Sequence, residues 1–390
     1  MIAYNKIWLA NLRLQEEVKT NLDRGFVTAE EFKNIQQKYV AGFYTPALFA
    51  RIGLFILTII VITFADGILS LLFASASNLF GTAGWVFFLS ILSYIALEVI
   101  INSKHHYRSG VDDALLFISA LLSCVAFGML FSHYNVVYYV PVSAAIFILT
   151  LYFTVRFADM LMAVLCCAAF LAFVYFGWTK SIPSGMLTIP FAIMLVSGGL
   201  YWLSNKLSKR KKLIDYHNCF VIAQLIFLLG LYAAGNYYIV QTFGNDSSDL
   251  TPKTVPFGAF FWLWTVLIPF VYLGWGIFKK DTILLRTGLA LIAVAIVTFR
   301  YYYHVLPLDI ALTIGGALVL GIAYAAMRYL KTPKRGFTYT EPETKQMMDH
   351  LKVESLIVAE TFAKIPAAPN HETSKFGGGD FGGGGSGDSY

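Results

Sequence analysis

Charged residues are scarce in this sequence: 13% of its 390 residues are Asp, Glu, Lys or Arg, against about a quarter in an ordinary soluble domain. Hydrophobic residues make up 57% and collect in repeated apolar runs. A run of about 20 apolar residues spans the hydrocarbon core of a bilayer as one helix. The composition therefore excludes a soluble globular domain and predicts an all-α, polytopic helix bundle whose surroundings are a lipid bilayer.

Cysteines and catalytic motifs are also few. The four cysteines lie in or beside apolar runs without metal-ligand spacing, which is typical of small core hydrophobes: Cys124, Cys166, Cys167 and Cys219. The motifs HExxH, GxSxG and GxxxxGK[ST] do not occur. We expect no catalytic residue, no metal and no cofactor. The net charge of +6 comes from basic residues at span ends, so we expect no nucleic-acid partner.

About ten transmembrane helices are predicted from the apolar runs. They cover residues 48–74, 81–102, 112–131, 136–155, 158–178, 186–204, 216–235, 257–278, 282–300 and 307–330. Every second connection is rich in Lys and Arg, as in the stretch NKLSKRKKL, whereas the alternate connections carry few basic residues. Cytoplasmic loops are the basic ones, so both termini are predicted to be cytoplasmic. The first 25 residues are polar and mixed in charge, and no cleaved signal peptide is expected.

Residues 1–46 are predicted to form a cytoplasmic helical hairpin before the bundle of residues 47–330. Gly25 suits the end of the first helix, and Thr28 and Glu31 form a capping box at the start of the second, followed by the apolar residue Phe32. Two helices this short are marginal alone. They should pack on each other, on the bilayer surface or on another subunit, which leaves a homo-oligomer as one open alternative.

The chain after the last span is polar. Residues 331–374 are predicted to be a cytoplasmic segment with one amphipathic helix, and residues 375–390, KFGGGDFGGGGSGDSY, a disordered tail, because glycine loses much entropy on ordering and little apolar surface offsets that loss. The three tail aromatics, Phe376, Phe381 and Tyr390, are candidate partner contacts, and Tyr390 joins a ring to the free carboxylate. A flexible spacer is the alternative.

Ionisable residues within the spans are candidate functional sites, since burying a charge in a membrane is costly. Asp66 interrupts the first apolar run as Ala65-Asp66-Gly67, either at mid-membrane depth or at the outer headgroups. Glu98 should pair with Lys104 or reach water, and Arg300 should pair with Asp309. Three further acids are expected to complement helix starts: Asp112, Asp113 and Asp159. Three histidines fall on the basic side, where structural roles are favoured over a metal: His105, His106 and His217.

A secondary transporter or channel is the alternative function that the sequence supports. In a five-plus-five repeat the first and sixth spans correspond, and both contain glycine-bearing interruptions, at Asp66 and at Ser197-Gly198-Gly199. Paired interruptions of this kind mark unwound binding sites in such transporters. Asp66, these three residues and Arg300 would then form the substrate site. Ordinary helix contacts through glycine would produce the same pattern.

The layout resembles a family of bacterial membrane proteins catalogued as a domain of unknown function. The resemblance rests on GFVTAEEFKNIQQKY, on RIGLFILTIIVITFAD at the first span, and on TFRYYYHVLPLDIALTIGGALVLGIAYAAMRYLKTPKRG. It implies a cytoplasmic hairpin followed by a polytopic bundle, and it implies no activity. The glycine-rich end separately resembles the tails of membrane proteins that carry TPM domains. Together these resemblances imply a protein of the bacterial inner membrane.

The leading hypothesis is a non-enzymatic inner-membrane scaffold, assembly or envelope-related component. The hairpin, through Thr28, Glu31 and Phe32, and the tail would dock protein partners. It rests on two interaction-like ends and on the missing catalytic motifs.

Overall fold

The structure is a computed structural model that describes residues 2–73, 82–133, 136–244, 256–303 and 308–329. Within these residues the chain is helical apart from an antiparallel pair of two-residue strands, β1 (Ser132–His133) and β2 (Val136–Val137). The prediction of an all-α polytopic bundle is confirmed. A chain in lipid must satisfy its backbone hydrogen bonds internally, and helices do so within each span.

The helices follow one another with short connections in most places. In order they are α1 (Lys6–Asp23), α2 (Ala29–Lys38), α3 (Leu48–Leu72), α4 (Ala83–Lys104), α5 (Val111–Leu130), α6 (Tyr139–Phe157), α7 (Met160–Ser181), α8 (Gly185–Ser208), the 3₁₀ helix η1 (Lys211–Tyr216), α9 (His217–Gly235), α10 (Tyr237–Gly244), α11 (Gly258–Lys279), α12 (Thr282–Tyr303) and α13 (Leu308–Tyr329).

Nine helices of the described part are long and apolar enough to cross a membrane: α3 to α8, η1 joined to α9, α11 and α12. They match the first nine expected spans to within a few residues. The tenth expected span is the helix α13, whose side chains are only partly described. The short helix α10 lies where the sequence predicted a long connection. Residues 330–390 lie outside the described part of the chain, and with them the predicted amphipathic helix and the glycine-rich tail.

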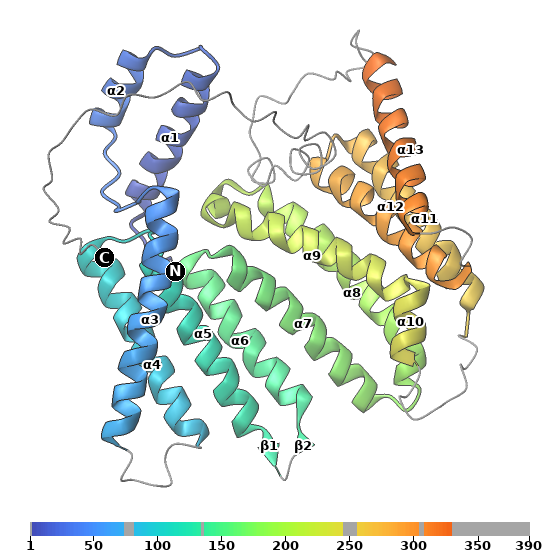
Figure 1. The fold of residues 1–390 in the computed structure, drawn as a ribbon, viewed down its shortest axis with the longest axis horizontal. Coiled ribbons are helices and arrows are strands. Elements are labelled where there is room, and N and C mark those ends of the chain that lie inside the picture. Colours follow the sequence, from blue (N-terminus) through green and yellow to red (C-terminus); the bar gives the residue numbers. More distant parts are fainter. Residues whose placement is uncertain (1, 74–81, 134–135, 245–255, 304–307, 330–390) are drawn as a thin grey trace, which may run out of the picture. The chain divides into compact units, whose positions relative to one another are not determined.

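Consecutive helices pack as hairpins, α4 with α5, α6 with α7, α8 with α9 and α11 with α12 (Figure 1). Small polar residues let α4 and α5 approach closely. The Ser90 hydroxyl donates to the Ser119 carbonyl at 2.8 Å and lies 2.5 Å from the Ser123 hydroxyl, with all three serines buried. Such contacts replace the hydrophobic driving force that is missing between helices in lipid.

The N-terminal hairpin has the caps that the sequence predicted. Gly25 has a φ of 78°, in the left-handed region. The Thr28 hydroxyl accepts from the Glu31 backbone, and the Glu31 carboxylate accepts from the Thr28 backbone N–H at 2.8 Å. These bonds hold the pKa of Glu31 below its usual value. The capping box is therefore complete above the ordinary Glu pKa and is lost as the pH falls through the lowered one.

Helix α3 reaches the rest of the bundle through α5. Gly110, immediately before α5, lies close to α3: an added Cβ there would be 2.2 Å from the Arg51 carbonyl oxygen. Gly110 also has a φ of 92°, which side chains rarely adopt. Glycine is thus required at this position for two independent reasons.

Replacing Gly110 by alanine should destabilise the folded protein by on the order of 3 kcal/mol, because the new methyl group meets the α3 backbone and strains its own. Thermal unfolding in a mild detergent measures this as a lower Tm. The matched control is Gly128→Ala in the same helix α5, where nothing lies within 4 Å of an added Cβ. Equal Tm values for the two variants would contradict the close approach.

Candidate functional site

The connection between α4 and α5, residues 105–110, has an unusual backbone. Three of its six residues have positive φ: His105 at 54°, Arg108 at 49° and Gly110 at 92°. Left-handed conformations are costly for residues other than glycine and collect at positions that a surrounding structure holds in place. This connection is the centre of the candidate site.

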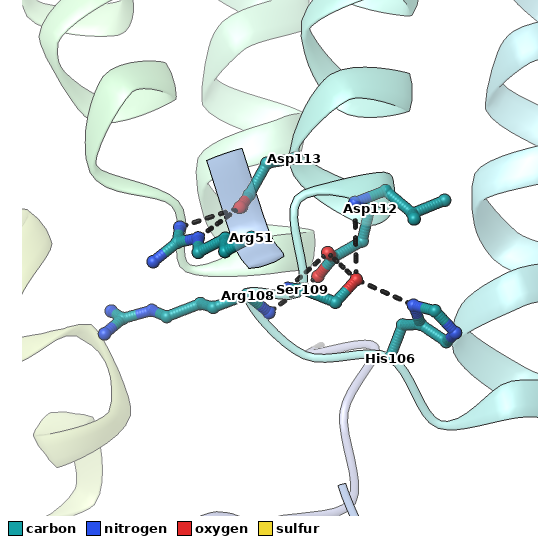
Figure 2. Close-up of polar contacts among 7 residues, drawn as sticks. Arg51, His106, Arg108, Ser109, Asp112 and Asp113 are labelled. Carbon is teal, nitrogen blue, oxygen red and sulfur yellow. Dashed lines mark hydrogen bonds and ion pairs between the residues drawn. The ribbon is translucent and has the colours of Figure 1, made fainter. Parts of the chain in front are cut away.

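The carboxylate of Asp112 holds the connection in shape (Figure 2). It accepts from the backbone N–H groups of Arg108 and Ser109, both at 2.8 Å, and from the Ser109 hydroxyl at 2.9 Å. The same hydroxyl lies 2.7 Å from Nδ1 of His106. Asp112 is 3% exposed and stands in the first turn of α5. Its negative charge therefore also complements the positive end of the helix dipole, as the sequence predicted.

The neighbouring acid, Asp113, joins α5 to α3. Arg51 donates from Nε and Nη2 to one Asp113 oxygen, at 2.9 Å and 2.7 Å (Figure 2). Charge-assisted bonds of this kind are stronger than neutral ones. The first span is therefore attached to the connection by an ion pair as well as by the approach at Gly110.

An aromatic cluster covers the connection and consists of residues from three segments. Its members are Tyr4, Trp8, Phe43, Tyr44, His105, His106 and Tyr107. The ring of Tyr107 lies 4.9 Å from that of Tyr4 and 5.0 Å from that of Phe43, and the ring of Trp8 lies 4.9 Å from that of His105. Edge-on aromatic contacts each contribute about 0.5–1.5 kcal/mol beyond the burial of their area. The cluster therefore fixes α1 and the segment before α3 onto the α4–α5 connection.

Backbone hydrogen bonds complete this attachment. The Tyr44 N–H donates to the His105 carbonyl at 3.1 Å, and the Tyr107 N–H donates to the Tyr44 carbonyl at 3.4 Å. The Ala3 N–H donates to the carbonyl of Arg156, at the end of α6, at 2.7 Å. Burial raises the pKa of Tyr4 well above its usual value, so this ring remains a neutral phenol.

A further ion pair ties α1 to η1. Arg13 donates from Nη2 to Asp215 at 2.7 Å, and the Asp215 side chain is only 15% exposed. Helix α1 therefore contacts the α4–α5 connection and η1, and Ala3, just before α1, contacts the end of α6. It is built into the bundle rather than lying free on the bilayer.

Helix α2 is different, since none of its residues is buried. Phe26, in the turn before it, is 77% exposed, and Phe32 is half-buried. Helix α2 packs on α1, and α1 is itself anchored to the bundle. Chemically, the site can hold and orient this hairpin.

The residues predicted for a transported substrate lie on separate helices. Asp66 is half-buried on α3, Ser197 is buried on α8, and Arg300 lies near the end of α12. The interruptions expected at Asp66 and at Ser197-Gly198-Gly199 are wrong, because α3 and α8 run continuously through them. Glycine is tolerated in membrane helices, where the lipid offers no competing hydrogen bonds.

Ser197 has a packing role in the structure. An added Cβ at Gly230 of α9 would lie 3.1 Å from the Ser197 hydroxyl oxygen, so the two residues mark the contact of α8 with α9. Open space surrounds Gly198 and Gly199. The pairing of Arg300 with Asp309 spans residues 304–307, which lie outside the described part, and it stays a prediction.

Glu98 is paired, but its expected partner was wrong. Arg156 of α6 donates to both Glu98 oxygens, at 2.8 Å and 2.9 Å, in place of Lys104. The Tyr94 hydroxyl also donates to Glu98 at 2.8 Å and lies 2.6 Å from the hydroxyl of Tyr152. A two-point guanidinium–carboxylate pair is the favoured way to keep two charges in a membrane helix bundle.

The remaining sequence candidates have local structural partners. Asp159 caps α7 by accepting from the Met162 N–H at 2.9 Å, which confirms its role at a helix start. His217 lies 3.1 Å from the Ser208 hydroxyl. Within the described residues, no group of three or more His, Cys, Asp or Glu is placed to hold a metal ion. The tail residues Phe376, Phe381 and Tyr390 lie outside that part of the chain.

The aromatic cluster and the Arg13–Asp215 pair were not predicted from the sequence. The signal that was available is the density of rings in two short polar stretches, GFYT at 42–45 and HHY at 105–107. Comparisons of the chain with protein-family models, with curated proteins and with solved structures found no match.

Replacing Tyr107 by alanine should release α1 from the bundle while leaving the spans in place, because this ring contacts both Tyr4 and Phe43. Loss of a large aromatic side chain from a packed cluster costs about 3 kcal/mol, so amide exchange in α1 should accelerate by on the order of 100-fold. Hydrogen exchange read by mass spectrometry tests this peptide by peptide.

The matched control for that experiment is Tyr39→Ala, which removes an exposed ring at the end of α2. It should leave exchange in α1 unchanged. If Tyr107→Ala also leaves α1 protected, the cluster does not anchor the hairpin.

Proposed function

We propose that this chain is a non-enzymatic scaffold or assembly component of a membrane, which docks protein partners through its N-terminal hairpin and its C-terminal tail. The observation that carries the proposal is the contrast between α1 and α2. Helix α1 is fixed to the bundle by rings, backbone bonds and an ion pair, whereas α2 has no buried residue. A helix held in a fixed orientation with its own surface free binds a partner without the entropy loss of ordering the support.

The membrane in this proposal is the bacterial inner membrane, with both termini in the cytoplasm. The support comes from the basic residues of every second connection. Arg108, Lys209, Arg210 and Lys211 lie in two such connections, and they line the same cleft as α1. The hairpin and the basic connections thus share one side of the bundle, which is the cytoplasmic side under this rule.

The transporter alternative loses the feature that motivated it. An unwound site needs broken helices whose ends face the substrate. Both helices that would supply one are continuous. The docking proposal therefore has the stronger structural support.

Opening the capping box should remove a partner that α2 binds. The double variant Thr28→Ala/Glu31→Ala loses both reciprocal bonds, and loss of an N-cap costs about 1 kcal/mol, enough to fray a ten-residue helix. Co-purification from membranes, with quantitative mass spectrometry, should show the partner depleted at unchanged levels of the inserted protein.

The control is Glu30→Ala, which removes an exposed acid of the same first turn without touching the capping bonds. Its co-purifying proteins should match those of the natural sequence. An unchanged set of partners in the capping-box variant would refute docking by α2.

Deleting residues 375–390 tests the second docking element. The truncated chain should insert normally, because all the candidate spans lie upstream, and should lose a partner distinct from that of α2. If the set of co-purifying proteins is unchanged, the tail is a spacer, and the hairpin is the one docking element that the proposal keeps.

A further inference from the structure

A cleft of about 440 Å³ opens beside α1, next to the α4–α5 connection and the α8–α9 connection. Tyr4 and Leu9, both buried, contribute apolar surface to it. Five basic side chains line it against two acidic ones, Glu16 and Asp215, which leaves a net charge of +3 with His217 neutral. The basic residues are Arg13, Arg108, Lys209, Arg210 and Lys211. Membrane orientation accounts for basic residues in these connections, but it does not require them to gather around one cleft.

Arg13 has an unused donor in this cleft. Its Nη2 binds Asp215, whereas its Nη1 is buried and has no acceptor within the described part of the chain. A buried donor without an acceptor costs free energy comparable to a lost hydrogen bond. A guanidinium offers donors in a planar fork, so Arg13, whose side chain lines the cleft, can offer this donor to a ligand oxygen once the side chain shifts to expose it.

Arg108 is directed toward the cleft and away from the nearest acids. Its backbone N–H binds Asp112, but its side chain extends away from Asp112 and Asp113 (Figure 2). Its guanidinium lies 5.4 Å from the ring centre of Tyr107. Arg108 takes part in none of the ion pairs among the described residues. The strained φ of 49° at Arg108 is part of the conformation that gives it this direction.

Arg108 still acts on one acid at longer range. Burial raises the pKa of Asp159, and the positive charge of Arg108 opposes that rise. Asp159 uses its carboxylate to cap α7, so it does not neutralise the guanidinium by direct contact. Arg108 therefore keeps donors for another anion.

The rim of the cleft is formed by Lys209, Arg210 and Lys211, all exposed. Two partly exposed arginines and three exposed basic side chains match the two needs of a phosphate group, which are directed hydrogen bonds and diffuse positive charge. The volume lies within the range of small-molecule pockets. The apolar residues of the lining suit a carbon skeleton attached to the phosphate.

We propose that this cleft binds a phosphate-bearing anion, with Arg13 and Arg108 donating to its oxygens and Lys209, Arg210 and Lys211 attracting it. The cleft lies where helices α7 and α9 begin, at the end of the membrane-spanning region. The phosphate therefore belongs either to the headgroup of an anionic phospholipid or to a soluble phosphorylated molecule, and the chemistry of recognition is the same. The proposal does not depend on the scaffold function.

Two arms of one experiment separate these sources. In neutral detergent, the full chain is titrated with glycerol 3-phosphate and its Tm is followed. In lipid nanodiscs, the Tm in pure phosphatidylcholine is compared with that in discs that also contain phosphatidylglycerol. A rise in the first arm without one in the second identifies a soluble ligand, and a rise in the second arm, with or without one in the first, identifies a lipid headgroup. No rise in either arm overturns the proposal.

Variants then assign the effect to the cleft. Arg108→Gln, and separately the triple variant Lys209→Gln/Arg210→Gln/Lys211→Gln, should weaken binding by about 10- to 100-fold, because each removes charge-assisted bonds. Arg108→Lys keeps the charge but loses the fork, so it should recover part of the affinity. If Arg108→Gln unfolds the α4–α5 connection, the triple variant still tests the cleft, because its three side chains are exposed.

The matched control removes the same charge as the triple variant, but from the N-terminal hairpin and outside the cleft. Lys19→Gln/Lys33→Gln/Lys38→Gln changes three exposed lysines of α1 and α2, none of which lines the cleft. It should bind as the natural sequence does. An equal loss in this control would show attraction by overall charge alone and would overturn the site.

Discussion

The structure depends on one short connection in which backbone strain is balanced by a buried carboxylate. Residues 105–110 contain three left-handed residues, and Asp112 holds them through two backbone N–H groups and one hydroxyl. Because this turn is fixed, Gly110 can approach the backbone of α3 and Arg108 can face the basic cleft. The ring of Tyr107 can contact Tyr4, just before α1, and Phe43. An acid that the sequence marks only as a helix-start residue thus supports the contacts of three separate segments.

Polar groups inside the bundle serve mainly to join helices. Ser90 bonds across to Ser119 and Ser123, and Glu98 receives two bonds from Arg156. At the end of α9, the buried side-chain amide of Asn236 donates to the hydroxyls of Tyr232 and Thr298, and the second bond joins α9 to α12. In a medium without water, each of these groups needs a protein partner, and meeting that need positions neighbouring helices.

The sequence predicts those features that depend on neighbouring residues. The span positions, the capping box of Thr28 and Glu31, the left-handed Gly25 and the cap at Asp159 follow from patterns a few residues long. The ion pairs do not: Arg51 and Asp113 are 62 positions apart, and Arg13 and Asp215 are 202 apart. Glu98 shows the same limit, because the nearest basic residue in sequence, Lys104, was expected to pair with it and a residue 58 positions away does so. Local reasoning also overestimated the tendency of Gly198 and Gly199 to break a helix, because α8 runs through both without interruption.

The Arg13–Asp215 pair imposes an order on the synthesis of the protein. Arg13 leaves the ribosome 202 residues before its partner, and at about 5–20 residues per second that is an interval of roughly ten to forty seconds. During that time η1 and α9 do not yet exist, so α1 cannot complete its docking. The first helix to be made therefore completes its docking only after α3 to α8 have been made.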